Sequence, residues 1–224
     1  MIDFILVPQG AEYQAVCRGL GRATAPSVIP IPVSPVPLKR YLKTWQQSQS
    51  LTGKKLLIMG LCGGLVPHYT IGEGVLYREC VNRTEPSASL PCDTTLLAWL
   101  QQTLSEQTAV VRALTSDRLV SSAQEKQQLA RQYRAEVVDM EGFAALEALG
   151  QADASIAMVR VVSDDAEYDL PTLSNAIDAD GNLRSLPLAW GMIRQPIAAI
   201  RLIRGSLRGL KTLEAIAKQL VNKR

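Results

Sequence analysis

The stretches Val137-Val138-Asp139-Met140-Glu141-Gly142 and Arg160-Val161-Val162-Ser163-Asp164-Asp165 decide the predicted fold, because each is a β-branched run that ends in acidic residues. Residues 143–149 lie between them and predict a helix. A strand returns to a parallel neighbour through a crossover helix, so strands at 136–138 and 155–162 are expected to end on the same edge of one sheet. This topology brings Glu141 and Asp164 to one crevice and predicts a functional site there.

Strands and helices alternate along the rest of the chain, which predicts an α/β fold with helices on both faces of a mixed, largely parallel central sheet. We expect a single three-layer αβα domain over residues 1–224, with a C-terminal helical extension at 168–224. The predicted strands are 4–7, a proline-rich edge strand within 26–37, 55–59, 72–81 and 109–115. The predicted helices are 11–20, 39–49, 94–104, 123–133 and, after a turn-rich segment at 178–182, two that are separated at Pro196.

Composition excludes several classes of protein. No run of about 18 apolar residues could span a bilayer, and residues 2–7 are too short for the apolar core of a signal peptide, so we expect a cytoplasmic protein. The net charge of +3 is too small to argue for a nucleic-acid partner.

Cysteine and histidine usage narrows the chemistry. The four cysteines (Cys17, Cys62, Cys80 and Cys92) are scattered without a C-x-x-C pair, so we expect neither a disulfide framework nor a zinc site. His68 is the only histidine, which removes most imidazole-based catalysis and most metal sites. The chemistry must therefore use carboxylates and backbone groups, with no metal and no organic cofactor.

The acidic residues have two interpretations each. Asp164 follows a buried strand beside Ser163 and Asp165, where burial and like charge favour a proton donor, yet an isolated S-D-D more often caps a turn. Asp139 is well placed as the N-cap of the helix at 143–149. Glu141 falls in the first turn of that helix, where it favours the helix dipole and can also face ligand hydroxyls.

A glycine-rich stretch and a third carboxylate belong to the same predicted edge. The stretch Gly60-Leu61-Cys62-Gly63-Gly64 matches neither G-x-G-x-x-G nor the P-loop, and a tight turn is its simplest interpretation. The N–H groups of Cys62, Gly63 and Gly64 can alternatively form an anion or hydroxyl site. Glu12 follows the first strand and is either a pocket carboxylate or a solvated residue of a first helical turn.

Three segments in register resemble one known family. IMGLCGGLVPHYTIGEGVL, VVDMEGFAALEA and VRVVSDDA, in this order and spacing, resemble the nucleoside phosphorylase and methylthioadenosine/S-adenosylhomocysteine nucleosidase superfamily, over residues 2–166. The resemblance implies cleavage of the N-ribosidic bond of a purine nucleoside through an oxocarbenium-like transition state. It also implies a homo-oligomer, in which neighbouring subunits sometimes complete the sugar pocket.

The resemblance assigns roles to individual residues. Asp164 would protonate purine N7, which contributes roughly 10²- to 10⁴-fold to such reactions, and Ser163 would hold it in position. Met140 would pack beneath the ribose, and Glu141 would accept hydrogen bonds from its 2′ and 3′ hydroxyls. Glu12 would orient an attacking water. The backbone of Leu119 and Val120 would contact the purine edge.

The glycine stretch departs from the family pattern. Leu61 stands where the family has serine, and Ile58 stands where the hexameric-type phosphorylases have arginine. The usual phosphate site is therefore altered. Either water attacks, or inorganic phosphate is a co-substrate held elsewhere, for example by Gly10 with Arg18 or Arg22.

The C-terminal segment has its own pattern. If residues 197–221 form one helix, basic and apolar residues fall on opposite sides, which is typical of a helix on an anionic membrane surface or of one docked on the core with a solvated basic face. The basic side has Arg201, Arg204, Arg208, Lys211 and Lys218, and the apolar side has Ala199, Leu202, Ile203, Leu210, Leu213, Ala217 and Leu220.

The same segment resembles one branch of the family. Asp169-Leu170-Pro171, Gly181-Asn182-Leu183-Arg184, Ile193-Arg194-Gln195-Pro196 and the basic helix are similar to the hopanoid-associated phosphorylases. That branch implies adenosylhopane, a lipid-linked adenosine, as the substrate. The alternatives are a methylthioadenosine/S-adenosylhomocysteine nucleosidase, a noncatalytic nucleoside-binding protein of the same fold, and a peripheral membrane scaffold that uses the basic helix.

Overall fold

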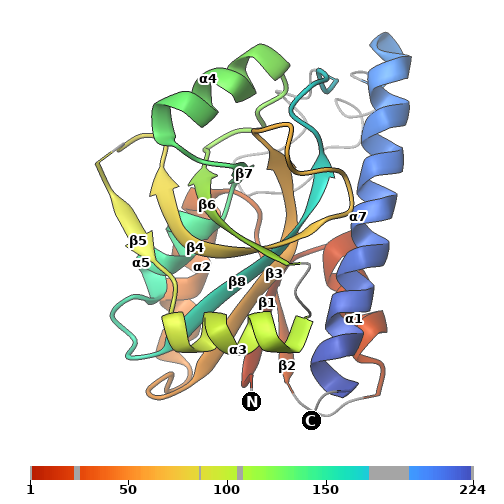
Figure 1. Cartoon of the computed structure of the whole chain (residues 1–224). Helices are drawn as coiled ribbons and strands as arrows, with labels where there is room; N and C mark the ends of the chain where they lie inside the picture. The colour runs from red at the N-terminus through yellow and green to blue at the C-terminus, as the bar shows by residue number, and fades with distance from the viewer. Residues whose placement is uncertain (1, 23–25, 86, 105–107, 172–191, 223–224) are drawn as a thin grey trace.

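The computed structural model describes residues 2–22, 26–85, 87–104, 108–171 and 192–222. The predicted turn-rich segment at 178–182 and the motif at 181–184 lie outside these described residues. Within them, eight strands form one mixed sheet with helices on both faces, so the predicted fold class is confirmed (Figure 1). The strands are β1 (Phe4–Pro8), β2 (Ser27–Ile31), β3 (Lys55–Gly64), β4 (Gly74–Asn82), β5 (Ser89–Pro91), β6 (Ala109–Thr115), β7 (Val137–Asp139) and β8 (Ser155–Asp164).

Two groups of helices cover the sheet and bury separate apolar clusters against it. On one face, α2 and α5 pack together over a core that includes Leu42, Tyr77 and Leu146. On the other face, α1 and α7 lie side by side and α3 packs near them, over a core that includes Leu57, Leu100 and Leu213 (Figure 1). The helices are α1 (Ala11–Leu20), α2 (Pro35–Gln47), α3 (Thr94–Leu104), α4 (Ala123–Tyr133), α5 (Gly142–Leu149) and α7 (Pro196–Asn222).

The pairing of the strands explains how the site forms. β3 pairs with β8 in parallel along its whole length and with β7 in antiparallel fashion at its end, and Gly63 is in register with both Val138 and Asp164. The prediction that β7 and β8 are parallel neighbours is therefore wrong, since β3 lies between them and β6 is the parallel neighbour of β7. Their acidic ends still meet, because both converge on the end of β3.

The glycine stretch does not form the tight turn that was its simplest interpretation. Residues 60–64 do not form a turn but continue β3, with a register irregularity between Cys62 and Gly63. A side chain at Gly60 would collide with the Arg160 guanidinium and the Glu12 carboxylate, and a Cβ at Gly63 would lie 2.8 Å from Asp164 Oδ2. The glycines therefore keep space for charged side chains that reach across the strand.

The other predicted elements agree closely with the structure, apart from three differences. The predicted helix at 39–49 begins earlier, at Pro35, because proline is accommodated in the first helical turn, where its missing N–H costs nothing. The short strand β5 was not predicted, because three residues are too few to show an alternating pattern. Ile203 was assigned to the packed side of the last helix but is 45% exposed.

Helix α7 approaches the end of β8 unusually closely. Gly205 and Gly209 lie one turn apart on its buried side. A Cβ at Gly205 would collide with the backbone carbonyl of Ser163, and one at Gly209 would lie 2.9 Å from a methyl group of Leu61. The helix backbone itself therefore supports the strand end that carries Ser163 and Asp164.

This contact predicts whether an alanine at Gly205 raises or lowers the unfolding free energy. On a solvent-facing helix position, Gly→Ala stabilises by up to about 1 kcal/mol through helix propensity. At Gly205 the added methyl group meets a backbone oxygen that cannot rotate away, so we expect Gly205→Ala to lower the unfolding free energy by about 1–3 kcal/mol. Urea unfolding measures this, with Ser206→Ala on the same helix as the control. A Gly205→Ala protein more stable than the wild type would contradict the packing.

Candidate active site

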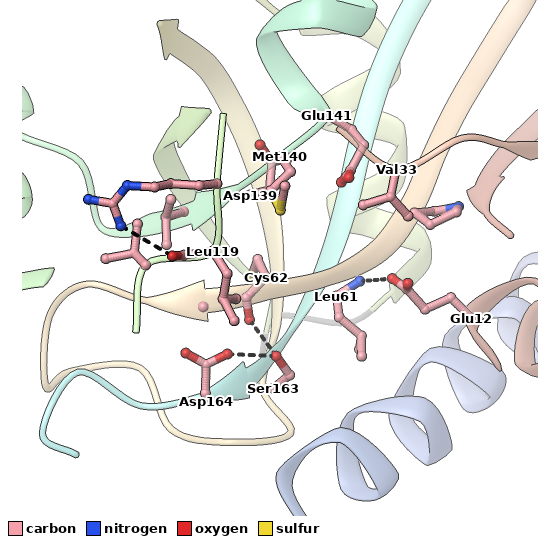
Figure 2. A pocket seen from close by; sticks show the side chains of 15 residues that line it. Glu12, Val33, Leu61, Cys62, Leu119, Asp139, Met140, Glu141, Ser163 and Asp164 are labelled. Carbon is pink, nitrogen blue, oxygen red and sulfur yellow. Dashed lines mark hydrogen bonds between the residues drawn. The ribbon is translucent and has the colours of Figure 1, made fainter. Parts of the chain in front are cut away.

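A cavity of about 170 Å³ opens at the convergent ends of β3, β7 and β8 (Figure 2). Nine of the residues predicted to form the site line it, and five regions of the chain contribute them. They are Glu12, Cys62, Gly63, Leu119, Val120, Met140, Glu141, Ser163 and Asp164. Pro8, Val33, Leu61, Arg118, Val138 and Asp139 complete the lining.

The remaining predicted residues lie elsewhere. Gly64 is paired within the sheet next to the cavity and does not line it. The proposed phosphate group of Gly10, Arg18 and Arg22 is not part of the lining either. Arg18 points to the outer surface, where its Nε lies 2.9 Å from Glu214 Oε2 of α7, and Arg22 is exposed beyond the end of α1. The geometry therefore gives no support to a phosphate site at these two arginines.

The half of the cavity near Glu141 is organised by a fully buried arginine that sequence reasoning missed. Arg160 Nη2 lies 3.2 Å from Asp139 Oδ2 and 3.3 Å from Glu141 Oε2, at ion-pair distances without hydrogen-bond alignment. Burial alone lowers the pKa of Arg160, but Asp139 and Glu141, with Tyr77 and Glu12, outweigh it and raise that pKa. Arg160 is thus a permanent cation among three carboxylates.

Asp139 is held rigidly in this cluster. Its Oδ1 accepts a hydrogen bond of 2.8 Å from the Thr115 hydroxyl, and both carboxylate oxygens accept the Gly142 N–H at 3.1 Å. The predicted N-cap assignment of Asp139 is therefore wrong, since Glu141 occupies that position, but the Asp139 carboxylate still accepts the first N–H group of α5. The same carboxylate therefore serves the helix and the Arg160 cluster.

Glu12 and Glu141 line the cavity, and their pKa values differ from those of solvated carboxylates. Burial raises the pKa of Glu12, with Arg160 opposing, and its Oε1 accepts a 2.6 Å hydrogen bond from the Leu61 N–H. Burial also raises the pKa of Glu141 to about 7, again opposed by Arg160. A carboxylate whose pKa is raised toward neutrality is a better proton acceptor than a solvated one.

Next to the half of the cavity near Asp164 lies a second buried cation that sequence reasoning missed. Lys126 of α4 is fully buried, and its Nζ lies 2.5 Å from both Asp164 Oδ2 and the Asp165 carbonyl oxygen. We expected Asp165 to place a like charge beside Asp164. Its carboxylate instead accepts the N–H groups of Glu167 and Tyr168, so the charge in contact with Asp164 is positive.

Ser163 completes this half of the site. Its Oγ lies 2.8 Å from Asp164 Oδ1 and 3.2 Å from the Cys62 carbonyl oxygen (Figure 2). A hydroxyl has one proton, so Ser163 donates either to Asp164 or to Cys62. When it donates to the Cys62 carbonyl, its own oxygen is free to accept a hydrogen bond from the acid form of Asp164. Ser163 can therefore hold Asp164 in either protonation state.

The fold and the cavity define a layered α/β protein with a carboxylate-rich pocket at the ends of its central strands. The family profile of the Phosphorylase superfamily matches residues 36–184, which is more than half of the chain, and the protein belongs to that superfamily. No curated protein matches it in sequence.

Solved structures agree in fold over nearly the whole chain. A futalosine hydrolase mutant of Helicobacter pylori superposes with a TM-score of 0.74 at 14% identity, covering 99% of this chain and 98% of that one. The 5′-methylthioadenosine/S-adenosyl homocysteine nucleosidase of the same organism, bound to an inhibitor, gives 0.73 at 14% identity, with 99% and 97% covered. S-adenosylhomocysteine nucleosidase of Streptococcus pyogenes, with 5-methylthiotubericidin, gives 0.71 at 16% identity, with 99% and 96% covered.

The Lys126–Asp164 pair makes a prediction for stability. Removing one member of a buried ion pair leaves the other charge uncompensated, so Lys126→Met should lower the unfolding free energy by about 3 kcal/mol. Adding Asp164→Asn to that variant removes the stranded carboxylate and should recover part of the loss. Denaturant unfolding of both single variants and the double variant measures the coupling, and exposed Lys43→Met is the control. Strictly additive losses would show that the pair does not interact.

The raised pKa of Glu141 predicts that the stability of the protein depends on pH. Because its pKa is about 7 in the folded protein and near 4.5 in the unfolded chain, the folded state binds more protons between these values. Stability should therefore fall as the pH rises from 4.5 to 7, by up to about 1.4 kcal/mol per pH unit from this group. Urea unfolding across this range should show a shallower decrease for Glu141→Gln. An unchanged slope in the variant would contradict the assignment.

Proposed function

We propose that the protein cleaves the N-glycosidic bond of a purine nucleoside and releases the free base. The observation that carries this proposal is the convergence of Glu12, Met140-Glu141 and Ser163-Asp164, from distant parts of the chain, around one cavity. These are the groups that the family resemblance assigns to the water, the ribose and the purine. Membership of the Phosphorylase superfamily supports the same class of reaction.

The proposed step uses the buried cation beside Asp164. The step starts from the acid form of Asp164, which transfers its proton to purine N7 while the C1′–N9 bond breaks and its electron pair goes to the purine. The attacking water bonds to C1′ and gives its proton to Glu12. The Asp164 carboxylate that remains is neutralised by the adjacent Lys126 ammonium. Glu141 accepts hydrogen bonds from the ribose hydroxyls, Met140 packs beneath the sugar, and the backbone at Leu119 and Val120 contacts the base edge.

We favour water over phosphate as the attacking group. Glu12 lines the cavity, and its burial gives it the character of a base that can orient and deprotonate water. Arg118 lines the cavity but is engaged in a bidentate pair with Glu125, at 2.6 and 3.2 Å. Arg18 and Arg22 lie away from the lining. The proposed reaction needs no organic cofactor.

For the substrate we propose a nucleoside with a large apolar 5′ group, adenosylhopane, as the resemblance of the C-terminal segment implies. Helix α7 packs its buried side against the end of β8 and exposes an apolar and basic face on the other side, and this arrangement supports a lipid-linked substrate. The second candidate is methylthioadenosine or S-adenosylhomocysteine. A mutant of the Helicobacter pylori nucleosidase, which shares the fold, has been solved with 5′-methylthioadenosine in its active site.

Asp164 tests whether the protein is an enzyme or a noncatalytic nucleoside-binding protein. Asp164→Asn keeps the size of the side chain but cannot transfer the proton, so we expect turnover to fall by roughly 10²- to 10⁴-fold while nucleoside binding persists. Asp165→Asn, one residue away and turned into the following loop, should keep most of the activity. Unchanged turnover in Asp164→Asn would overturn the proton-donor role.

The substrate and the attacking group are tested in one assay. Purified protein is incubated with adenosylhopane and with methylthioadenosine, each with and without phosphate, and free adenine is measured. We expect adenine release from adenosylhopane at a rate that phosphate does not change. A requirement for phosphate would overturn the hydrolytic assignment, and release from neither nucleoside would overturn both substrate proposals.

A further inference from the structure

The first half of α7 exposes a continuous row of large apolar side chains. Ile197, Ile200, Ile203 and Leu207 are 69%, 49%, 45% and 55% exposed, and spacings of three or four residues place them along one side of the helix. Single exposed apolar side chains are ordinary on protein surfaces, but a contiguous row marks an interaction surface. The opposite side of α7, with Ala199, Gly205, Gly209 and Leu213, is buried against the rest of the protein.

Basic side chains run beside this row. Arg201, Arg204, Arg208 and Lys211 are exposed on the same outer half of the helix, and residues 192–213 contain no acidic residue. The Arg201 guanidinium stacks 3.9 Å above the ring of Tyr168, which is itself 47% exposed. On α7, Glu214 is paired with Arg18, and Glu167 and Asp169 lie beside the start of the helix. An aromatic ring, an apolar row and a basic row thus share one surface.

The positive charge of this surface favours an anionic bilayer over a second copy of the chain as its partner. A second copy of the chain, packed through the same face, would bring two rows of arginine and lysine together without opposing carboxylates between residues 192 and 213. An anionic bilayer instead offers apolar chains to the row of isoleucines and phosphate groups to the basic side chains. Amphipathic helices that lie in the headgroup region have this combination.

We propose that the outer face of the first half of α7 docks the protein on the surface of an anionic membrane. Among the described residues, no helix is long and apolar enough to cross a bilayer, which distinguishes docking from insertion. The first half of α7 lies at the same end of the molecule as α4, which carries Lys126 (Figure 1). Docking does not rest on the proposed reaction, because vesicle binding is measured without substrate.

The test compares vesicles of phosphatidylcholine alone with vesicles that contain phosphatidylglycerol, by sedimentation of the full chain at low salt. We expect at least tenfold tighter binding to the anionic vesicles, weakened at high salt because exposed charges are screened. Arg204→Gln with Lys211→Gln should weaken binding about tenfold or more, since each basic residue near the headgroups contributes roughly a fivefold factor. Ile200→Ser with Leu207→Ser should weaken it by a similar factor.

Matched controls separate this face from the rest of the surface. Val36→Ser removes an apolar side chain that is 73% exposed on α2, and Arg131→Gln removes an exposed charge on α4. Both should bind vesicles within about twofold of the wild type. Surface substitutions are preferable to deletion of the helix, because Leu213 and Ala217 are fully buried and their removal would unfold the core. Thermal unfolding confirms that each variant is folded.

Three results would overturn the proposal. Equal binding to neutral and anionic vesicles, or no binding to either, would contradict an anionic surface. Wild-type binding by both face variants would place the contact elsewhere. Loss of a dimer in light scattering for Ile200→Ser with Leu207→Ser, without any vesicle binding by the wild type, would identify the face as an interface between copies.

Discussion

The site depends on one buried guanidinium. Arg160 is completely enclosed between β3 and the start of α5, where carboxylates of Glu12, Asp139 and Glu141 surround it. A buried charge is tolerated only when opposite charges compensate it, so Arg160 and its carboxylates require one another. The absence of a side chain at Gly60 provides the space in which they meet. Residues from α1, β3, β7, β8 and the start of α5 are thereby fixed relative to each other before any ligand arrives.

The two buried cations divide the cavity into two chemically different halves. Arg160 faces carboxylates whose pKa values are raised by burial, and this half suits hydroxyl groups and water. Lys126 is in contact with Asp164, where the proposed reaction moves a proton and leaves a negative charge behind. Preorganised charges of this kind need no rearrangement when the reaction occurs, which is the largest source of catalysis in many enzymes. The proposed sugar and base positions follow this division.

Family resemblance, and not a local signal, assigned Leu119, Val120 and Met140 to the cavity. From glycine positions, acidic strand ends and apolar periodicity, which are local signals, the sequence predicted the layered fold, most element boundaries and the other six lining residues. It did not predict Arg160 or Lys126, although each left a trace. Arg160 interrupts an otherwise apolar strand, and Lys126 shares a helix face with the buried Leu129 and Tyr133. A charge on an apolar face has meaning only when its partner is known, and the partners lie at least 19 residues away in the chain. Topology also overrode the expected parallel pairing of β7 and β8, because β3 is long enough to pair with both.

The close approach of α7 to β8 has a consequence for how this protein can be altered. Gly205 and Gly209 fix the axis of the helix against Ser163 and Leu61. The side chains on its outer half are largely exposed, although Arg201 stacks on Tyr168 and Arg208 lies against Gly72. The inner and outer sides of this helix can therefore be substituted independently of each other. Substitutions on the outer surface can change which cellular surface the protein binds, or abolish that binding, while the geometry of the pocket is preserved. Any change that shifts the helix axis by the width of a methyl group is expected to reach the pocket directly.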